Sequence, residues 1–567
     1  MPPRRRLTSL FRRLRLGDSD LSGHSIKEFL QNRPIYYKKI DYERFPRAYA
    51  AIKDKIPLKN VIQIIGTNGK GSTGRFLANA IAAAGFNVGH YTSPHVFRLN
   101  ERIYLGGRIA QSPVFALNSG ASNFKNEQNS ASASNFTEKQ NSIKMQNFAS
   151  GENSASQISI SNLQNSATQD FIATQNLHSE QNSALQSFVS TTRNFCSKQN
   201  FIARNSIDTQ NSASTQNLWN SQDLKLPSEQ NFKFSPEQNF KSPLGSNFKS
   251  AQSSPPISLG RDATDEELDF AHEFLQESLP AEFKDSLSYF EYLTLAAAVL
   301  FRDCDYCVIE AGMGGEFDAT SSFGRMLSLF TPIGTDHLGM LGQNLEQIAH
   351  TKLITMDKEA ILSDEMSEVP LRIAQQIAEQ KGTHLRFAAE LLSKSEQAQI
   401  AEFCAHNNLP KFQISNLALA LAAMKFLNLK FEISQLPPLN LRGRMEVLAP
   451  NLRVDVGHNE LAAQQVAREI TEIYGGKKIV LIYNAFADKD VAAVLRTLAP
   501  VVERVEIFNY EVADREMAAE AITRALDALK IPHSPFRGEL RADEEYLVFG
   551  SFHLVENFIL WLEARRG

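Results

Sequence analysis

Short apolar runs alternate with amphipathic stretches along most of the chain, which is the pattern of strands separated by helices. The run VIQII at residues 61–65 predicts a buried strand. An amphipathic helix is expected after it, because one helical face collects Phe76, Leu77, Ala80, Ile81 and Ala84. Gly85 is a natural terminator of that helix. Further strands are expected at residues 306–310, 327–334, 452–456, 478–483, 502–508 and 546–550. Such a chain predicts parallel sheets in an α/β architecture.

The alternation is interrupted between residues 111 and 256, where Gln-Asn-Ser-Ala recurs at Gln128, Gln164, Gln181 and Gln210. A polar, repetitive stretch cannot bury enough apolar surface to offset the entropy of ordering its backbone. We therefore expect a low-complexity insertion in a surface loop, with association through its spaced phenylalanines as the alternative.

A second boundary is expected at Pro437-Pro438, which follows a helix-like segment and precedes another α/β run. The predicted organisation is a first domain of residues 23–110 and 257–436 and a smaller Rossmann-like domain of residues 437–567. Residues 1–22 form a basic segment, which we interpret as a solvated tail. A targeting or membrane-surface role for that tail is the alternative.

Composition and charge narrow the class of protein. The chain has 567 residues, 43% of them hydrophobic, and a formal net charge of −4, so no global positive field favours nucleic acid. No apolar run approaches the ~20 residues of a membrane helix, and the start lacks the apolar core of a secretory signal. We expect a cytoplasmic monomer that binds neither nucleic acid nor membranes.

The cysteines suggest no metal or redox site. Four are too few and too scattered for a disulfide framework. Cys304 and Cys307 spell C-x-x-C, but they enter an apolar run in which a strand would place them on opposite faces. No second pair completes a zinc site, so both are expected in the core, with metal or redox chemistry as the alternative.

The strongest candidate for chemistry is a glycine-rich segment between the first strand and its helix. The backbone N–H groups of such a loop, with the helix N-terminus, cradle phosphates. Lys70 would neutralise the charge of the β- and γ-phosphates, and Ser72 offers a hydroxyl to Mg²⁺. The generic Walker pattern would need glycine in place of Ile64 and a hydroxyl directly after the lysine. The segment predicted to bind ATP comprises Gly66, Thr67, Asn68, Gly69, Lys70, Gly71 and Ser72.

A series of motifs resembles one family. GTNGKGS is followed by YTSPH at residues 91–95, NERI at 100–103 and YFE at 289–291. IEAGMGGEFDAT, IGTDHLGMLGQNLEQIA, FQISNLALAL, LRGRMEV, DVGHN, FADKD and GSFHLV then follow in order. This series resembles folylpolyglutamate synthases and bifunctional dihydrofolate synthases of the Mur ligase superfamily. It covers most of the chain outside the insertion, and implies a P-loop ATPase domain followed by a Rossmann-like domain.

The resemblance implies an ATP-dependent ligase. A pteroate or folate carboxylate would attack the γ-phosphate of ATP, and the amine of L-glutamate would then displace phosphate from the acyl phosphate. Metal and lysine charge must screen the two anions. The substrates implied are dihydropteroate or a reduced folate, ATP with Mg²⁺, and L-glutamate. The alternatives are a Mur-type ligase for another carboxylate, and a nucleotide-binding protein that has lost ligation and acts by association.

The resemblance also implies roles for single residues. Glu310 would bind Mg²⁺ with Ser72, Ser93 and His337, and Lys352 would be carbamylated and act in catalysis with Lys70. Glu310 also ends an apolar strand, where α/β folds place ligand groups. Imidazole is an unusual partner of so hard a cation, so His337 depends on the resemblance. The second domain would supply Arg444 and His458 for catalysis, with Asn416, Arg444 and Asp455 contacting ATP. The implied substrate contacts are Arg102, Phe290, Asp318 and Ser551, with a core role as the alternative for Phe290.

Three departures from the family pattern lie near these residues. Glu316 replaces an arginine, and Ser321 replaces an asparagine. TKLITM at residues 351–356 keeps only Lys352 of a longer motif, so a plain surface lysine is the alternative there. With these changes the chain is still expected to be a ligase, but the geometry of substrate binding is expected to differ from that of the family.

Overall fold

The computed structural model describes residues 25–34, 41–111, 259–512 and 515–566. The predicted basic tail, nearly all of the predicted insertion, and Cys196 lie outside the described residues. By contacts, the chain divides into one unit of Met1–Asn123 with Ser250–Gly567 and another of Phe124–Lys249. All of the described residues belong to the first unit.

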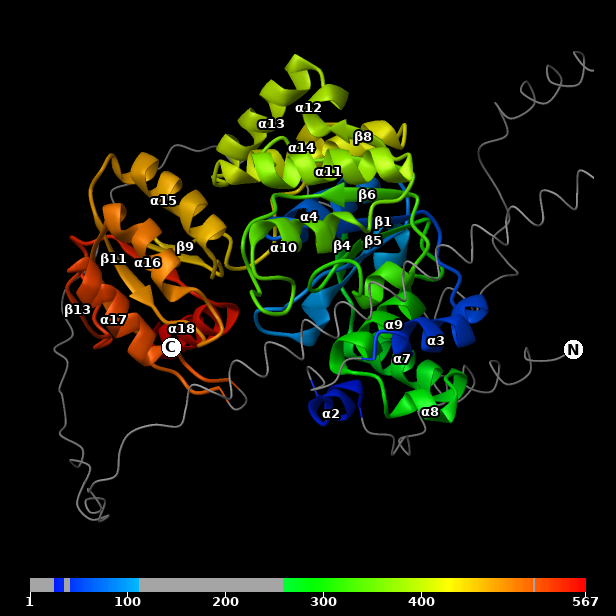
Figure 1. Cartoon of the computed structure of the whole chain (residues 1–567), viewed down its shortest axis with the longest axis horizontal. Helices are drawn as coiled ribbons and strands as arrows, with labels where there is room; N and C mark the ends of the chain where they lie inside the picture. Colours follow the sequence, from blue (N-terminus) through cyan, green and yellow to red (C-terminus); the bar gives the residue numbers. More distant parts are fainter. Residues whose placement is uncertain (1–24, 35–40, 112–258, 513–514, 567) are drawn as a thin grey trace, which may run out of the picture. The chain divides into compact units, whose positions relative to one another are not determined.

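Within the described ranges, eight strands form a sheet in the order β4-β3-β2-β5-β1-β6-β7-β8 (Figure 1). The six strands from β2 to β8 in this order run parallel, while β3 and β4 pair antiparallel at one edge. Central strand β1 is buried along its whole length, as its apolar run predicts. The bounds are β1 Val61–Ile65, β2 Val88–Tyr91, β3 Ile103–Gly106, β4 Gly260–Asp262, β5 Tyr306–Glu310, β6 Leu327–Phe330, β7 Glu359–Leu362 and β8 His384–Phe387.

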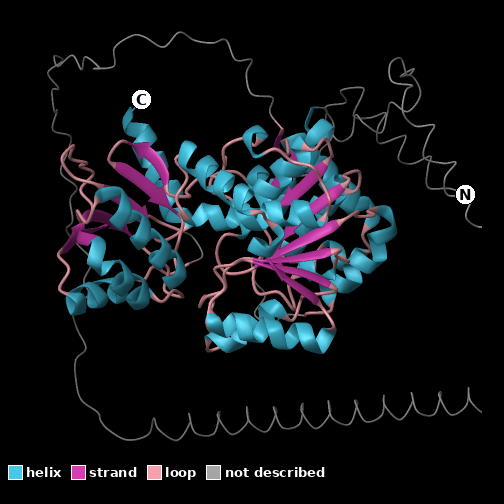
Figure 2. Cartoon of the chain, turned by 90° about the horizontal axis from the view of Figure 1, so that it is seen from above, coloured by secondary structure: helices cyan, strands magenta, loops and turns pink. Residues whose placement is uncertain are grey.

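Helices cover both faces of this sheet (Figure 2). Because side chains alternate along β1, Val61 packs into one core with α9, and Ile62 packs into another with α4 and α14. The helix bounds are α2 Ile26–Gln31, α3 Arg44–Ile52, α4 Lys70–Ala83, α7 Asp265–Ser278, α8 Ala281–Lys284, α9 Tyr289–Phe301, α10 Leu345–Leu353, α11 Glu368–Lys381, α12 Ala388–Leu391, α13 Lys394–His406 and α14 Phe412–Phe426. Single 3₁₀ turns are η1 Lys53–Lys55, η2 Leu99–Arg102, η3 Gly107–Gln111, η5 Ala319–Ser322 and η6 Ile433–Gln435.

In the described residues after Pro437-Pro438, six strands form a second sheet, in the order β13-β12-β11-β14-β10-β9. All pair parallel except edge strand β9. The domain boundary at the two prolines stays a prediction, with the two sheets lying on either side of it. The elements are β9 Glu446–Ala449, β10 Leu452–Asp455, α15 Glu460–Tyr474, β11 Ile479–Tyr483, α16 Val491–Leu498, η7 Ala499–Val501, β12 Val502–Ile507, α17 Ala519–Leu529, β13 His533–Pro535, β14 Tyr546–Phe549 and α18 Phe552–Arg566.

The fold class is confirmed, with local corrections. The helix α4 is not amphipathic, because every residue from Gly71 to Ala82 is buried. The strand predicted at residues 327–334 ends at Phe330, because Pro332 lacks the N–H that a central strand needs. Cys304 precedes β5 and does not lie on it, although both cysteines of the C-x-x-C are free and buried.

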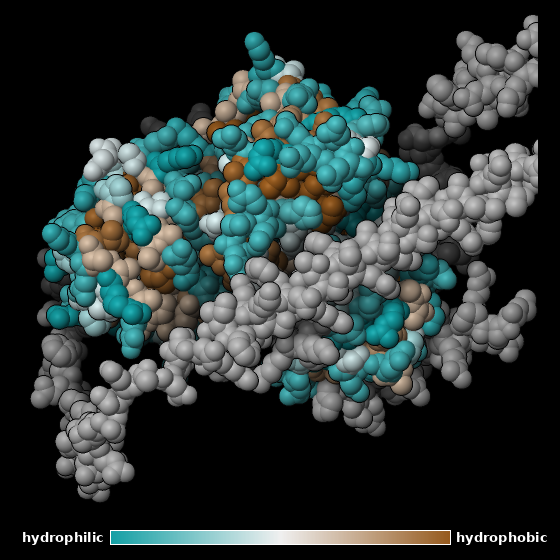
Figure 3. All heavy atoms as spheres, viewed as in Figure 1, coloured by the Kyte–Doolittle hydropathy of each residue, from teal (hydrophilic) through white to brown (hydrophobic). Residues whose placement is uncertain are grey.

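The lengths and apolarity of the described helices test whether they could span a membrane. None of the described helices is both long and apolar enough to span a bilayer. On the face shown in Figure 3, hydrophilic side chains are interspersed with small groups of apolar ones.

The edge of the first sheet brings together the two chain segments that flank the predicted insertion. Gly107 N donates a hydrogen bond to Leu259 O at 2.8 Å. Arg261 Nε donates to Ala110 O at 2.9 Å. Strands β3 and β4 pair on the same edge. We call this set of contacts the stem.

Candidate active site

The glycine-rich segment is a tight loop between β1 and α4. Gly69 has a φ of +88°, and a Cβ there would lie 2.3 Å from the Asn416 side-chain oxygen. This close approach excludes any larger residue and puts Asn416 of α14 against the loop. Helix α4 begins at Lys70, so its free N–H groups and positive dipole end face the loop. The loop and the helix start that the sequence predicts are therefore present, and their binding of phosphate stays a prediction.

Lys70 lies beside a buried carboxylate at the end of β5. Lys70 Nζ is 3.7 Å from Glu310 Oε1 and donates a hydrogen bond to Thr67 O at 3.2 Å. Glu310 accepts hydrogen bonds from the Thr92 hydroxyl and, at 3.3 Å, from Ser93 N. Burial raises the pKa of Glu310, and the charge of Lys70 opposes that rise. A desolvated carboxylate facing one ammonium is electrostatically suited to a further cation.

The chemistry of the donors around Glu310 fits a hard cation such as Mg²⁺. A Cβ added at Gly71 would lie 3.0 Å from Thr92 Oγ1 and 3.4 Å from Glu310 Oε2, so these oxygens crowd the start of α4. Ser72 and Ser93 line the same cavity. Carboxylate and hydroxyl oxygens are the ligands this cation prefers. Among the described residues no group of three His, Cys, Asp or Glu side chains could hold a metal, so this donor set is incomplete without ligand oxygens or water.

Lys352 is not a surface lysine. Its side chain on α10 is 4% exposed, and its Nζ donates a hydrogen bond to Gly66 O at 3.0 Å. Burial and, to a smaller extent, the nearby charge of Lys70 lower the pKa of Lys352 to about 7. A substantial fraction of this amine is therefore neutral near pH 7.

His337 occupies the loop after β6 with a φ of +52°, a conformation uncommon outside glycine. Burial lowers the pKa of His337 to about 4, against the opposing charge of Asp336. The imidazole is therefore neutral near pH 7, which is the form that coordinates metals.

The second sheet contributes Asp455 at the end of β10 and Arg444 before β9. Asp455 accepts hydrogen bonds from Gly457 N at 2.7 Å and from Met445 N at 2.9 Å. Burial raises the pKa of Asp455, and the guanidinium of Arg444 opposes this shift. The Arg444 guanidinium carbon lies 5.2 Å from the centroid of the Phe552 ring.

One cavity collects most of the residues that the sequence singled out. It is lined from both sheets, and the predicted residues among those lining it are Gly66, Thr67, Asn68, Gly69, Lys70, Gly71, Ser72, Ser93, Glu310, His337, Lys352, Asn416, Arg444, Asp455 and His458. The four predicted substrate contacts do not line it: Arg102, Phe290, Asp318 and Ser551. The roles of all these residues stay predictions.

Two of those four residues, Phe290 and Asp318, lie around the loop that follows β5, while Arg102 contacts the segment that follows β2. Arg102 Nε donates a hydrogen bond to His95 Nδ1 at 2.8 Å. Phe290 packs against Gly312, where an added Cβ would lie 2.5 Å from the ring. Asp318 accepts a hydrogen bond from Met313 N at 3.0 Å, so it also shapes this loop.

The structure also shows the contacts of Ser551 and of two residues, Glu316 and Ser321, that depart from the family pattern. Ser551 Oγ accepts a hydrogen bond from Leu554 N at 2.9 Å and lies 3.0 Å from the Tyr510 hydroxyl. Glu316 is exposed and does not line the cavity, so its reversed charge lies outside it. Ser321 Oγ donates to Gly315 O at 2.6 Å and helps to hold the glycine loop.

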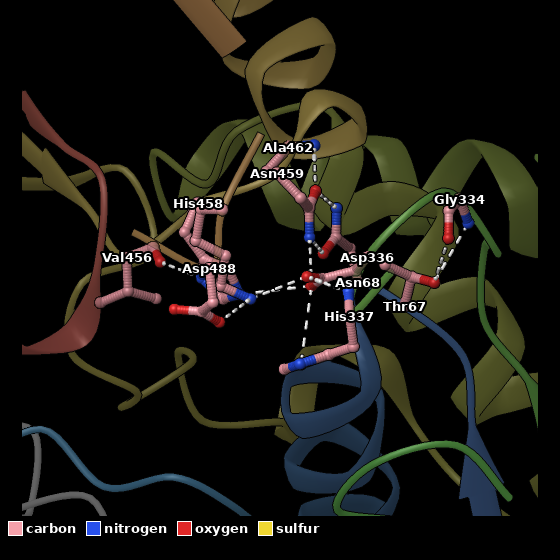
Figure 4. A network of polar contacts seen from close by, with 12 residues as sticks. Thr67, Asn68, Gly334, Asp336, His337, Val456, His458, Asn459, Ala462 and Asp488 are labelled. Carbon is pink, nitrogen blue, oxygen red and sulfur yellow. Dashed lines mark hydrogen bonds and ion pairs between the residues drawn. The ribbon is translucent and has the colours of Figure 1, made fainter. Parts of the chain in front are cut away.

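Sequence reasoning missed a polar network centred on Asp336 (Figure 4). Asp336 lies 3.3 Å from His458 Nε2 and accepts hydrogen bonds from Asn459 at 3.0 Å and from Lys489 at 2.8 Å. The Asn459 amide also faces that of Asn68 at 3.0 Å. A signal existed, because these residues belong to the motifs IGTDHLG, DVGHN and FADKD.

Comparisons with known proteins identify relatives of this chain. No protein-family model matches the chain. The dihydrofolate synthase/folylpolyglutamate synthase of Escherichia coli strain K12 is 29% identical over 306 residues, which is 50% of this chain and 71% of the relative. The protein of the same name from Buchnera aphidicola subsp. Schizaphis graminum is 28% identical over 299 residues, 48% of this chain and 71% of the relative.

Solved structures extend the likeness over the chain. The crystal structure of Helicobacter pylori folylpolyglutamate synthetase is 28% identical, with a TM-score of 0.55 over 95% of this chain and 98% of that one. The bifunctional Yersinia pestis enzyme complexed with AMPPNP and Mn ion is 18% identical, with a TM-score of 0.58 over 95% of this chain and 98% of that one. The latter supports the shared fold alone.

Proposed function

The chain belongs to the dihydrofolate synthase/folylpolyglutamate synthase family and is an ATP-dependent ligase that adds L-glutamate in folate synthesis and polyglutamylation; on this premise, we propose that the cavity between its two sheets is the site of ligation. One observation carries the proposal. The start of α4, Lys70 and buried Glu310 face a cavity that Arg444 and His458 also line from the second sheet.

The reaction requires two anions to meet, namely a substrate carboxylate and the γ-phosphate of ATP. The carboxylate oxygen forms a bond to γ-phosphorus, and ADP leaves. The N–H groups at the start of α4 hold the phosphates, while the charges of Lys70 and Arg444 offset the repulsion. The amine of L-glutamate then attacks the acyl carbon and expels phosphate.

The family uses ATP with a divalent metal, and the residues present fit Mg²⁺. Glu310, Ser72, Ser93 and His337 would hold it. When bound, the metal neutralises phosphate charge. Asn416 on α14 and Asp455 on β10 would contact the nucleotide from opposite sheets.

Lys352 has the properties of a lysine that reacts with CO₂. Its amine is buried, and a substantial fraction is neutral near pH 7, which is the nucleophilic form. The carbamate would replace a cation in the cavity with an anion bearing two oxygens, which suits a hard metal ion.

The proposal also covers the substrate-binding residues, the cellular compartment and the assembly state. Arg102, Phe290 and Asp318 would bind the pteridine-bearing substrate near the loop that follows β5, and Ser551 would position L-glutamate. We place the enzyme in the cytoplasm as a monomer, in line with the sequence. Light scattering on the purified full chain tests the assembly state.

ADP release that requires both L-glutamate and a pteroate or folate tests the proposed function. Reactions lacking one substrate at a time give the baseline, and dihydropteroate and tetrahydrofolate are assayed separately to identify which activities are present. Lys70→Ala should lose the activity, while Lys59→Ala should retain it because Lys59 is exposed. ADP release that is independent of L-glutamate would instead indicate the nucleotide-binding alternative.

A further inference from the structure

Asp336 is a buried acidic residue to which the mechanism above gives no role. Its side chain is 9% exposed, and it accepts a hydrogen bond from Lys489 Nζ, 7% exposed, at 2.8 Å. Its other carboxylate oxygen accepts from Asn459 Nδ2 at 3.0 Å and lies 3.3 Å from His458 Nε2. Figure 4 shows His458 and Asn459, which follow β10, beside the carboxylate of Asp336, which follows β6. Lys489, which follows β11, binds the same carboxylate.

The network continues into the phosphate loop. The side-chain amides of Asn459 and Asn68 face each other at 3.0 Å. Asn459 Oδ1 also accepts a hydrogen bond from Ala462 N at 2.9 Å, which caps α15. The side chain that binds Asp336 is thus fixed at a helix start and contacts the glycine-rich loop beside Lys70.

We infer that Asp336 is a positioning residue of the ligation reaction, which sets the His458 imidazole against the cavity and orients the Asn459 amide beside the phosphate loop. This inference rests on the proposed function of the same cavity. Asp336 is poorly suited to contact phosphate itself, because both are anions. Lys489 offsets the charge of Asp336, so the carboxylate acts through the side chains that it orders.

The pairing of Asp336 with Lys489 makes this role testable by a double-mutant cycle. Removing one partner leaves the other buried and uncompensated, and disturbs His458 and Asn459 as well. Removing both relieves the uncompensated charge. If the two residues act as one unit, their single effects will not multiply.

The cycle comprises Asp336→Asn, Lys489→Met and the double variant. We expect each single variant to lose kcat by about 30-fold, and the double variant to lose no more than about 30-fold, where independent effects would multiply to about 1,000-fold. The Kd for ADP, measured by calorimetry, should change by less than about threefold, because the start of α4 is untouched. Asp285→Asn and Lys477→Met are matched controls, because both side chains are exposed members of ion pairs away from the cavity, and both variants should retain wild-type kcat.

Three results overturn the inference: wild-type kcat in folded Asp336→Asn, multiplicative losses in the double variant, or a loss of kcat matched by an equal loss of ADP-binding sites. The last would show a purely structural role. The wild-type chain separates these failures from that of the proposed function. Without glutamate-dependent ADP release by the wild-type chain, the proposed function fails and the inference falls with it.

Discussion

The two sheets contribute to the cavity in different ways. On the first, Lys70 and Glu310 lie where a buried helix begins and a buried parallel strand ends, so backbone packing fixes them. On the second, His458 lies in a loop after β10 and meets the first sheet's Asp336 through its side chain. The Lys70–Glu310 part of the site, the rigid half, is therefore fixed by backbone packing, whereas the position of His458 depends on a few polar contacts.

The largest effect should come from the rigid half. Lys70→Ala should reduce kcat by about 10³-fold or more, because a preorganised charge on the phosphates is lost. The fold should survive, since Lys70 belongs to no apolar core. Turnover and circular dichroism of the variant test this. Near-native turnover in folded Lys70→Ala would contradict the phosphate-loop assignment.

Lys352 lies on α10, beside the first sheet, and on our proposal it acts only after carbamylation, so it tests the comparison further. Lys352→Ala should lose activity by about 10²-fold, as removal of a metal-organising group does. Short-chain carboxylic acids should restore part of the activity by supplying the missing oxygens. Exposed Lys358→Ala is the control. Continuous extra density on Lys352 in a crystal structure of the ATP complex would support carbamylation, and full activity of Lys352→Ala would exclude it.

The same lysine predicts a pH dependence of stability in CO₂-depleted buffer. Its pKa is about 7 in the folded chain against an ordinary 10.5, so the unfolded chain binds more protons between these values. The unfolding free energy therefore gains a contribution from Lys352 as pH rises from about 7. Lys352→Met should be more stable than wild type by on the order of a few kcal/mol below pH 7. That advantage should shrink toward pH 10. Urea denaturation at several pH values measures it, and a pH-independent difference would contradict the shifted pKa.

The difference between the two halves also explains what the sequence could predict. GTNGKGS is contiguous, and its strand–loop–helix context already implies backbone geometry, so the sequence alone predicts the roles of Lys70 and Ser72. Asp336 and Lys489 are 153 residues apart, and their pairing depends on how two sheets meet. No periodicity encodes that distance. The full burial of α4 was missed for the same reason, because its polar side chains are covered by other segments: Arg75 donates to Asn440 at 3.0 Å, and Asn79 accepts from Tyr104 at 2.7 Å.

The smallest effect should come from removing the insertion. Replacing residues 112–255 with a short Gly/Ser linker should leave kcat within about twofold, because the stem already joins the flanking segments. Limited proteolysis of the native chain should cut this segment first. Unfolding of the shortened chain, or resistance of the segment to protease, would contradict the surface-loop interpretation.

The stem has a consequence for how this gene can change. Gly107 and Leu259 are joined by a hydrogen bond of 2.8 Å, although residues 108–258 separate them in the chain. On the surface-loop interpretation, we expect repeat expansion or contraction between these positions to leave the register of β3 with β4 unchanged, so selection on catalysis should not act against it. For the same reason, we expect the stem to tolerate the insertion of a whole foreign domain, provided that the two termini of that domain lie close together.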